Sequence, residues 1–166
     1  MLRILLLSLA LLIPSLSVAQ QGDPVTEFST EDDRMNAAME QAKTTLPVFL
    51  ANVTDGEGNS LPNTSLKVAF PTPSGAEIIW VSPFLWDGGV NMAGILANQP
   101  NFMGDLNAGD VVEFQTDMVR DWSLITPDGM MWGNYTTRVM LPSLDAATAA
   151  SLGQRLSKNP VPAQWN

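Results

Sequence analysis

Hydrophobic residues follow a helical period in the first third of the chain. After the polar run at 29–33, apolar side chains recur at Met35, Ala38, Met39, Ala42 and Leu46. This spacing predicts an amphipathic helix, with Thr30 as its N-cap and acidic residues at the positive end of its dipole. Pro47 has no backbone N–H to donate, so we expect a break or kink there and a second short helical turn over 48–53.

The period then changes from helical to alternating. Turn residues separate short segments that alternate or are rich in β-branched and aromatic side chains: 66–70, 77–84, 90–96 and 111–115. These segments predict strands. An alanine-rich run at 144–156 predicts a C-terminal helix, followed by a frayed tail at 160–166. The fold class is therefore predicted to be α+β: an N-terminal helix packed on a curved, mainly antiparallel sheet of about five or six strands, plus a C-terminal helix.

The segment Asp121–Arg138 carries the densest group of large and polar side chains in the chain. Its central sequence Pro127-Asp128-Gly129 predicts a type I turn followed by a glycine in the left-handed conformation. This turn would set Leu124 opposite Trp132 and continue the second strand as far as Arg138. A two-residue turn would shift the pairing by one residue, so both registers stay open at this point.

Five residues of this hairpin are candidates for a binding site: Trp122, Asn134, Arg138, Asp121 and Tyr135. They would line a groove for a peptide, a sugar or a carboxylate ligand, because arginine presents a planar fork to acidic groups. The alternative is structural. The rings would then belong to the core, and the polar groups would be hydrogen-bonded to avoid a cost of about 1–3 kcal/mol each. A third possibility is catalysis by Asp121 together with Tyr135 or Lys67.

Two residue types are missing from the chain, and their absence limits its chemistry. Without cysteine no disulfide can form, and without histidine the Ser-His-Asp and Cys-His mechanisms and the usual zinc and copper ligand sets are excluded. No run has the ligand spacing of a calcium loop. We therefore expect no metal and no cofactor, so any catalysis would depend on carboxylates, lysine, tyrosine or a Ser-Lys pair.

The formal net charge is −9 at pH 7. Nucleic acids and anionic lipids require a concentrated positive patch, so the acidic balance argues against both as partners. It favours a soluble protein or a cationic partner.

Residues 1–19 have the pattern of a secretory signal peptide. Arg3 precedes an apolar run over 4–13, and Ser17-Val18-Ala19 offers small residues for cleavage before Gln20. The run is shorter than the ~20 residues of a spanning helix, so no stable membrane anchor is expected. We predict export to the periplasm or the extracellular space. The rest of the chain is expected to form a flexible leader (20–28), a single α+β domain (29–142) and a C-terminal helix with a tail (143–166).

Several blocks of the sequence resemble, in order, the YegJ-like domain of unknown function 2314. These blocks are Met35–Ala42 with Leu46–Phe49, Lys67–Phe70, Glu77–Val81, Gly94 with Asn98–Pro100, Gly109–Phe114, Asp121-Trp122 and Gly133–Arg138. The resemblance covers roughly Asp33 to Val139 and implies an uncharacterised bacterial protein, often exported. It brings no established activity, cofactor or catalytic residue, and it leaves the helix after Leu144 without a counterpart.

The sequence as a whole favours a small non-catalytic binding or interaction domain whose partner is an unknown protein or small ligand. Two alternatives stay open. One is an envelope enzyme that uses carboxylate, tyrosine or lysine chemistry. The other is a toxin-neutralising immunity-type protein, which the acidic charge and small size would fit.

Overall fold

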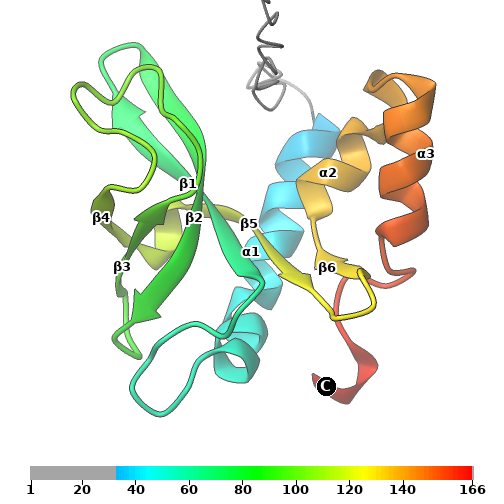
Figure 1. The fold of residues 1–166 in the computed structure, drawn as a ribbon, viewed down its shortest axis with the longest axis horizontal. Coiled ribbons are helices and arrows are strands. Elements are labelled where there is room, and N and C mark those ends of the chain that lie inside the picture. Colours follow the sequence, from blue (N-terminus) through cyan, green and yellow to red (C-terminus); the bar gives the residue numbers. More distant parts are fainter. Residues whose placement is uncertain (1–32, 166) are drawn as a thin grey trace, which may run out of the picture.

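The computed structural model describes residues 33–165 of the chain. Helix α1 (Asp33–Val53) packs on a six-stranded antiparallel sheet, and helices α2 (Tyr135–Met140) and α3 (Ala146–Arg155) follow the last strand (Figure 1). This arrangement confirms the predicted α+β class. The predicted signal peptide, the leader and the Thr30 cap lie outside the described residues. Within the described part of the chain, no helix has both the length and the apolar character needed to cross a membrane.

Helix α1 continues through Pro47, so a break at this proline, one of the two expected outcomes, is wrong, whereas a kink stays a prediction. The buried side chains keep their helical spacing on both sides of it: Met35, Ala38, Ala42, Leu46, Phe49, Leu50 and Val53. A proline inside a helix costs about 3 kcal/mol. Full burial of Phe49 and Leu50 contributes about 1.5–3 kcal/mol each, so tertiary packing offsets that cost and keeps 48–53 in the same helix.

The sheet has the strand order β4-β3-β2-β1-β5-β6, and every neighbouring pair is antiparallel. Its strands are β1 (Thr64–Thr72), β2 (Gly75–Trp86), β3 (Asn91–Leu96), β4 (Val111–Gln115), β5 (Val119–Ile125) and β6 (Met131–Gly133). A short 3-10 helix at Thr116–Met118 joins β4 to β5. The chain therefore passes from the β4 edge of the sheet to a position between β1 and β6.

The two faces of the sheet carry different side chains. Leu66 on β1 pairs with Trp122 on β5, and both side chains are fully buried in the core against α1. Phe49 of α1 stacks on the Trp122 ring with 4.6 Å between centroids. The next pair along the strands, Lys67 and Asp121, points to the opposite face because side chains alternate along a strand.

Strands β5 and β6 form the predicted hairpin. Leu124 lies opposite Trp132, which confirms the register set by a type I turn. Gly129 has φ +86°, the left-handed conformation expected at that position. Gly129 N–H also donates to the Thr126 carbonyl, which closes the turn.

The chain after β6 does not continue the hairpin, which corrects the strand expected through Arg138. Asn134 adopts a left-handed conformation with φ +54°, and residues 135–140 form α2. A 3-10 turn at Leu141–Ser143 leads into α3. In Figure 1, α2 and α3 lie on the side of the molecule that carries β6, away from β3 and β4.

The C-terminal residues 160–165 pack on the fold, so the predicted fraying of this tail is wrong up to Trp165. Pro160 O accepts a 2.8 Å hydrogen bond from Gly133 N. The Trp165 ring lies 6.1 Å from that of Trp122 and 6.4 Å from that of Phe49. The tail therefore completes the aromatic group around Trp122.

Candidate functional site

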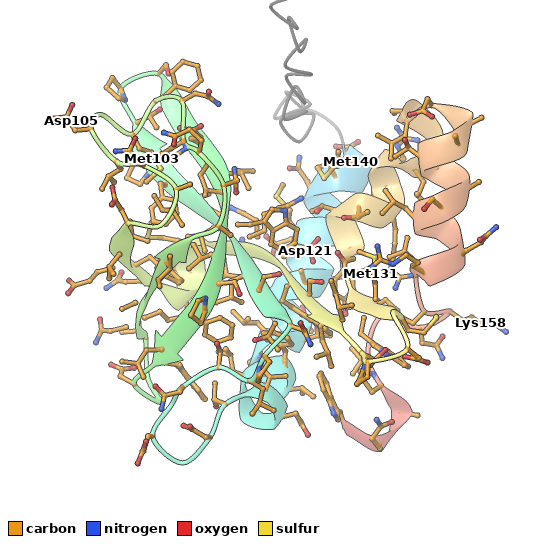
Figure 2. All side chains as sticks on the ribbon, viewed as in Figure 1. Met103, Asp105, Asp121, Met131, Met140 and Lys158 are labelled. Atoms are coloured by element: carbon orange, nitrogen blue, oxygen red, sulfur yellow. The ribbon has the colours of Figure 1, made fainter. Side chains whose placement is uncertain are left out.

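The Asp121 carboxylate is fully buried beside the start of α2. Its Oδ1 accepts from Trp122 N at 2.8 Å and from Tyr135 N at 3.1 Å. Its Oδ2 accepts from Thr136 N at 2.8 Å and Thr136 Oγ1 at 2.6 Å. The carboxylate thus binds the first backbone N–H groups of α2, which no helical carbonyl can reach. Figure 2 labels Asp121 between the strands and the helices that it joins.

Lys67 supplies positive charge near this carboxylate. Its Nζ donates to Thr136 Oγ1 at 2.9 Å and lies 4.9 Å from the centroid of the Trp80 ring. Burial raises the pKa of Asp121, while the Thr136 hydroxyl and the charge of Lys67 oppose that rise. Lysine, threonine and aspartate therefore form a hydrogen-bonded relay that ends on a buried acid.

Trp122 and Tyr135 share one hydrogen-bond partner on α1. Trp122 Nε1 donates to Thr45 Oγ1 at 3.0 Å, and the Tyr135 hydroxyl lies 2.9 Å from the same oxygen. Thr45 directs its own proton to the carbonyls of Gln41 and Ala42, so the tyrosine hydroxyl is the donor to Thr45. Burial raises the pKa of Tyr135 above its usual range.

Asn134 fixes the turn between β6 and α2. Its Nδ2 donates to Ser123 Oγ at 2.9 Å and to Trp132 O at 2.8 Å, and the residue is 2 % exposed. Asparagine is among the few residues that adopt the left-handed conformation readily. Its amide therefore holds backbone geometry in place and presents no donor to solvent.

Arg138 ties α2 to the C-terminal segment. Its Nε donates to Gly133 O at 3.1 Å, and its two terminal nitrogens donate to the Ser157 carbonyl at 2.7 Å and the Ser157 hydroxyl at 3.2 Å. Burial lowers the pKa of Arg138. The planar fork expected to bind an acidic ligand is used here on the protein's own oxygen atoms.

The structure brings all five predicted residues into one cluster, but it does not arrange them around a common cavity. The Tyr135 hydroxyl contacts α1, whereas the Tyr135 N–H contacts Asp121. Lys67 reaches the carboxylate through Thr136. Because Asp121 is fully buried, no substrate can touch its oxygens in this conformation. A ligand role for the five residues stays a prediction.

Sequence reasoning missed four hydroxyl side chains that complete the cluster: Thr45, Ser123, Thr136 and Ser157. Thr45 lies 77 residues before Trp122, so no local pattern links the two. Thr136 lies within the segment Asp121–Arg138, where it was expected to be a strand residue, whereas the structure places it in the first turn of α2.

Shallow hollows on the surface of residues 33–165 include the following two. One, of about 310 Å³, is bordered by Gln41, Thr44, Thr45, Tyr135 and Pro160. The other, of about 250 Å³, lies over strands β2, β3 and β4, and its lining includes Leu85, Ala93, Ile95 and Val111. Within residues 33–165, no group of three or more acidic side chains could hold a metal ion.

Comparison with known proteins identifies the family. A family model described as "Uncharacterized protein conserved in bacteria (DUF2314)" matches residues 32–154. The chain belongs to the DUF2314 family. The match runs through α3 almost to its end, so the expectation that the helix after Leu144 lacks a counterpart in the family is wrong. All five predicted residues fall inside the DUF2314 match, whereas Ser157 and Trp165, which complete the cluster, lie beyond it. No curated protein and no solved structure matches the chain.

Proposed function

We propose that this DUF2314 protein is a small exported bacterial domain that binds or interacts with a partner and does not catalyse a reaction. The observation that carries the proposal is the state of Asp121. Its carboxylate is 0 % exposed and accepts four hydrogen bonds from groups of the fold itself. A general acid or base must lie within hydrogen-bond reach of a substrate proton.

The remaining acid–base groups of the cluster support the same conclusion. The Tyr135 hydroxyl is bonded to Thr45, and Lys67 is bonded to a threonine whose own proton goes to Asp121. Each group stabilises a neighbouring element. The polar atoms of Tyr135, Lys67 and Asp121 thus have partners within the protein, and this supports a structural role for them over a catalytic one.

A binding role instead finds support on the other parts of the surface. Three large apolar side chains are exposed on the sheet face opposite α1: Ile78 at 44 %, Leu85 at 45 % and Val111 at 68 %. Two of them, Leu85 and Val111, border the same hollow. Leu85 and Val111 therefore belong to one apolar area, and exposed apolar areas are typical of sites that contact other molecules.

The first test is an activity panel. Purified protein without its predicted signal peptide is incubated with ester, glycoside and peptide substrates, beside the Asp121→Asn variant. We expect no turnover above buffer in either sample. Turnover by the wild type that Asp121→Asn abolishes, with the variant still folded by circular dichroism, would overturn the non-catalytic assignment.

The second test concerns export. Cells of the source bacterium are fractionated, and the protein is located by immunoblot. We expect a processed form that begins near Gln20 in the periplasm or the medium, as mass spectrometry of the isolated band would show. An unprocessed chain confined to the cytoplasm would contradict export while leaving the binding role unaffected.

A further inference from the structure

The two edge strands of the sheet differ in whether another segment of the chain covers their outer side. At the β6 end, the C-terminal segment covers the edge: Leu156 forms a parallel bridge with Met131, Ser157 N donates to Met131 O at 3.0 Å, and Pro160 accepts from Gly133. At the β4 end, no strand among residues 33–165 pairs with the outer edge. An open edge presents a row of backbone N–H and C=O groups to any extended chain.

The register of β4 identifies the groups that point outward. Thr116 N donates to Val90 O, and Leu96 N donates to Asp110 O. Bonding groups alternate along an antiparallel strand, so the even-numbered residues of β4 face β3 and the odd-numbered ones face away. Gln115 N donates to Met118 Sδ at 3.5 Å. The backbone groups of Val111 and Glu113 are therefore left for a new strand.

The side chains beside this edge alternate as well. Val112 and Phe114 are buried in the core, whereas Val111, Glu113 and Gln115 are exposed on the opposite face. That face continues across Ala93, Ile95 and Leu85, which line the 250 Å³ hollow. A strand added to β4 would place every second side chain on this face, beside Val111 at the rim of the apolar surface.

Charge decides which kind of strand fits. Three acidic residues lie in or next to β4: Asp110 directly before it, Glu113 within it, and Asp117 in the 3-10 helix that follows. The chain as a whole carries a net charge of −9. A second copy aligned on β4 would bring these acids together, and like charges placed opposite each other on a sheet are destabilising. A basic segment would meet opposite charge at Glu113, and Asp110 and Asp117 add negative charge at the two ends of β4.

We propose that β4 is the docking strand for an extended, positively charged peptide segment of a partner protein. The segment adds to the sheet by main-chain hydrogen bonds at Val111 and Glu113, with its basic side chains near Glu113 and its apolar side chains beside Val111, at the near rim of the hollow. This mode is strand addition, in which backbone bonds give affinity and alternate side chains give specificity. The proposal rests on the proposed binding function and names the partner class and the surface.

The experiment titrates ¹⁵N-labelled protein with a short capped peptide and follows amide shifts and hydrogen exchange by NMR. The peptide carries lysine and valine in turn at every second position, with threonine between them, so that both side chains fall on the face of Val111 and Glu113. Two matched peptides serve as controls: one with glutamate in place of lysine, and one with proline at alternate positions, which cannot donate. We expect saturable shifts and slowed exchange at Val111 and Glu113 with the lysine peptide alone. Binding should weaken as salt is added, because exposed charges are screened.

Two variants at one position separate backbone from charge. Glu113→Ala removes the carboxylate and keeps the outward N–H, whereas Glu113→Pro removes both while sparing the bonds to β3. We expect Glu113→Pro to bind the lysine peptide about tenfold more weakly than Glu113→Ala. Thermal melts that agree between the two variants show that the fold is kept. If Glu113→Pro does not fold, comparison of the lysine and proline peptides on the wild type carries the same test.

Several results would overturn the proposal, and each is distinct from failure of the proposed function. Equal binding of the three peptides, shifts confined to another surface, or no saturable binding would remove β4 as the basic-peptide site while the binding role stands. A dimer in sedimentation that Glu113→Pro dissociates would assign the edge to a second copy. Cleavage of the peptide by the wild type would instead contradict the non-catalytic function itself.

Discussion

Gly133 approaches Trp122 so closely that no side chain fits between them. A Cβ at position 133 would lie 2.2 Å from the Trp122 carbonyl oxygen and 2.4 Å from Cε3 of its ring. Gly133 also has φ +71°, which disfavours any residue with a side chain. The chain therefore needs glycine here for two independent reasons, and both concern the strand-to-helix turn that follows.

Replacing Gly133 with alanine is expected to destabilise the fold strongly. Backbone strain costs about 1–3 kcal/mol, and overpacking against Trp122 adds about 1–3 kcal/mol. Urea unfolding measures the loss. Gly129→Ala is the matched control, since Gly129 has φ +86° with nothing within 4 Å of the added Cβ. Equal losses in the two variants would show that backbone conformation alone matters at position 133.

Asp121→Asn keeps the shape of the side chain and removes its charge. One oxygen becomes an NH₂ group that meets N–H and O–H donors of residues 135 and 136, so hydrogen bonds to α2 are lost. We expect unfolding free energy to fall by about 2–3 kcal/mol, as measured by urea denaturation. The exposed Asp117→Asn makes the same chemical change and should stay within about 0.5 kcal/mol of wild type. Similar losses in both variants would contradict a structural role for the buried carboxylate.

Thr45→Val tests the hydroxyl shared by Trp122 and Tyr135. The variant leaves two donors without their acceptor at nearly constant volume, so we expect a loss of about 1–3 kcal/mol in unfolding free energy. Thr44→Val, one residue earlier and exposed, removes a hydroxyl that bonds only to the Glu40 carbonyl. Chemical denaturation of the pair gives the difference. Near-identical denaturation midpoints for the two variants would show that the bonds of Thr45 to Trp122 and Tyr135 do not contribute to stability.

The sole tyrosine of the chain allows a direct pKa measurement. Burial raises the pKa of Tyr135, so the folded protein retains the phenolic proton at a pH where the unfolded chain has lost it. Stability contributed by this group is therefore full below the unfolded pKa of about 10 and declines as pH rises above it. The tyrosinate absorbance of the native protein should therefore rise at a higher pH than that of the protein in denaturant.

Tyr135→Phe provides the linked control. The variant has no phenolic proton, so its unfolding free energy should decline less steeply with alkaline pH than that of the wild type. Coincident absorbance titrations of the native and denatured wild type, or parallel alkaline profiles of the two proteins, would argue that the hydroxyl is solvated.

Local patterns predicted the elements that depend on neighbouring residues. The spacing of Met35 to Leu46 predicted the start of α1, and the Pro127-Asp128-Gly129 turn predicted the β5–β6 hairpin, with its register left between two alternatives. The break expected at Pro47 does not form, because burial of Phe49 and Leu50 against a sheet built from later parts of the sequence offsets the local cost of the proline. A single sequence does not show which contacts will supply that compensation.

The start of α2 illustrates why part of the site was not predictable. Its sequence Tyr-Thr-Thr-Arg-Val is rich in β-branched residues, which favour strands. The helix forms because Asp121, fourteen residues before Tyr135, accepts its first N–H groups, and because Asn134 turns the chain. Composition identified the right residues, but only the fold shows that their polar atoms bond to one another.

The unequal ends of the sheet also limit how far the protein can assemble. The β6 end is closed by the C-terminal segment at Leu156–Pro160, so one open edge remains among the described residues, along β4. A sheet with two open ends can grow without limit into a fibre, because each added chain exposes a fresh edge. Here any pairing through β4 ends the growth, since the far end of each molecule accepts no further strand. An exposed edge can thus be kept for recognition without turning the protein into a polymerising unit.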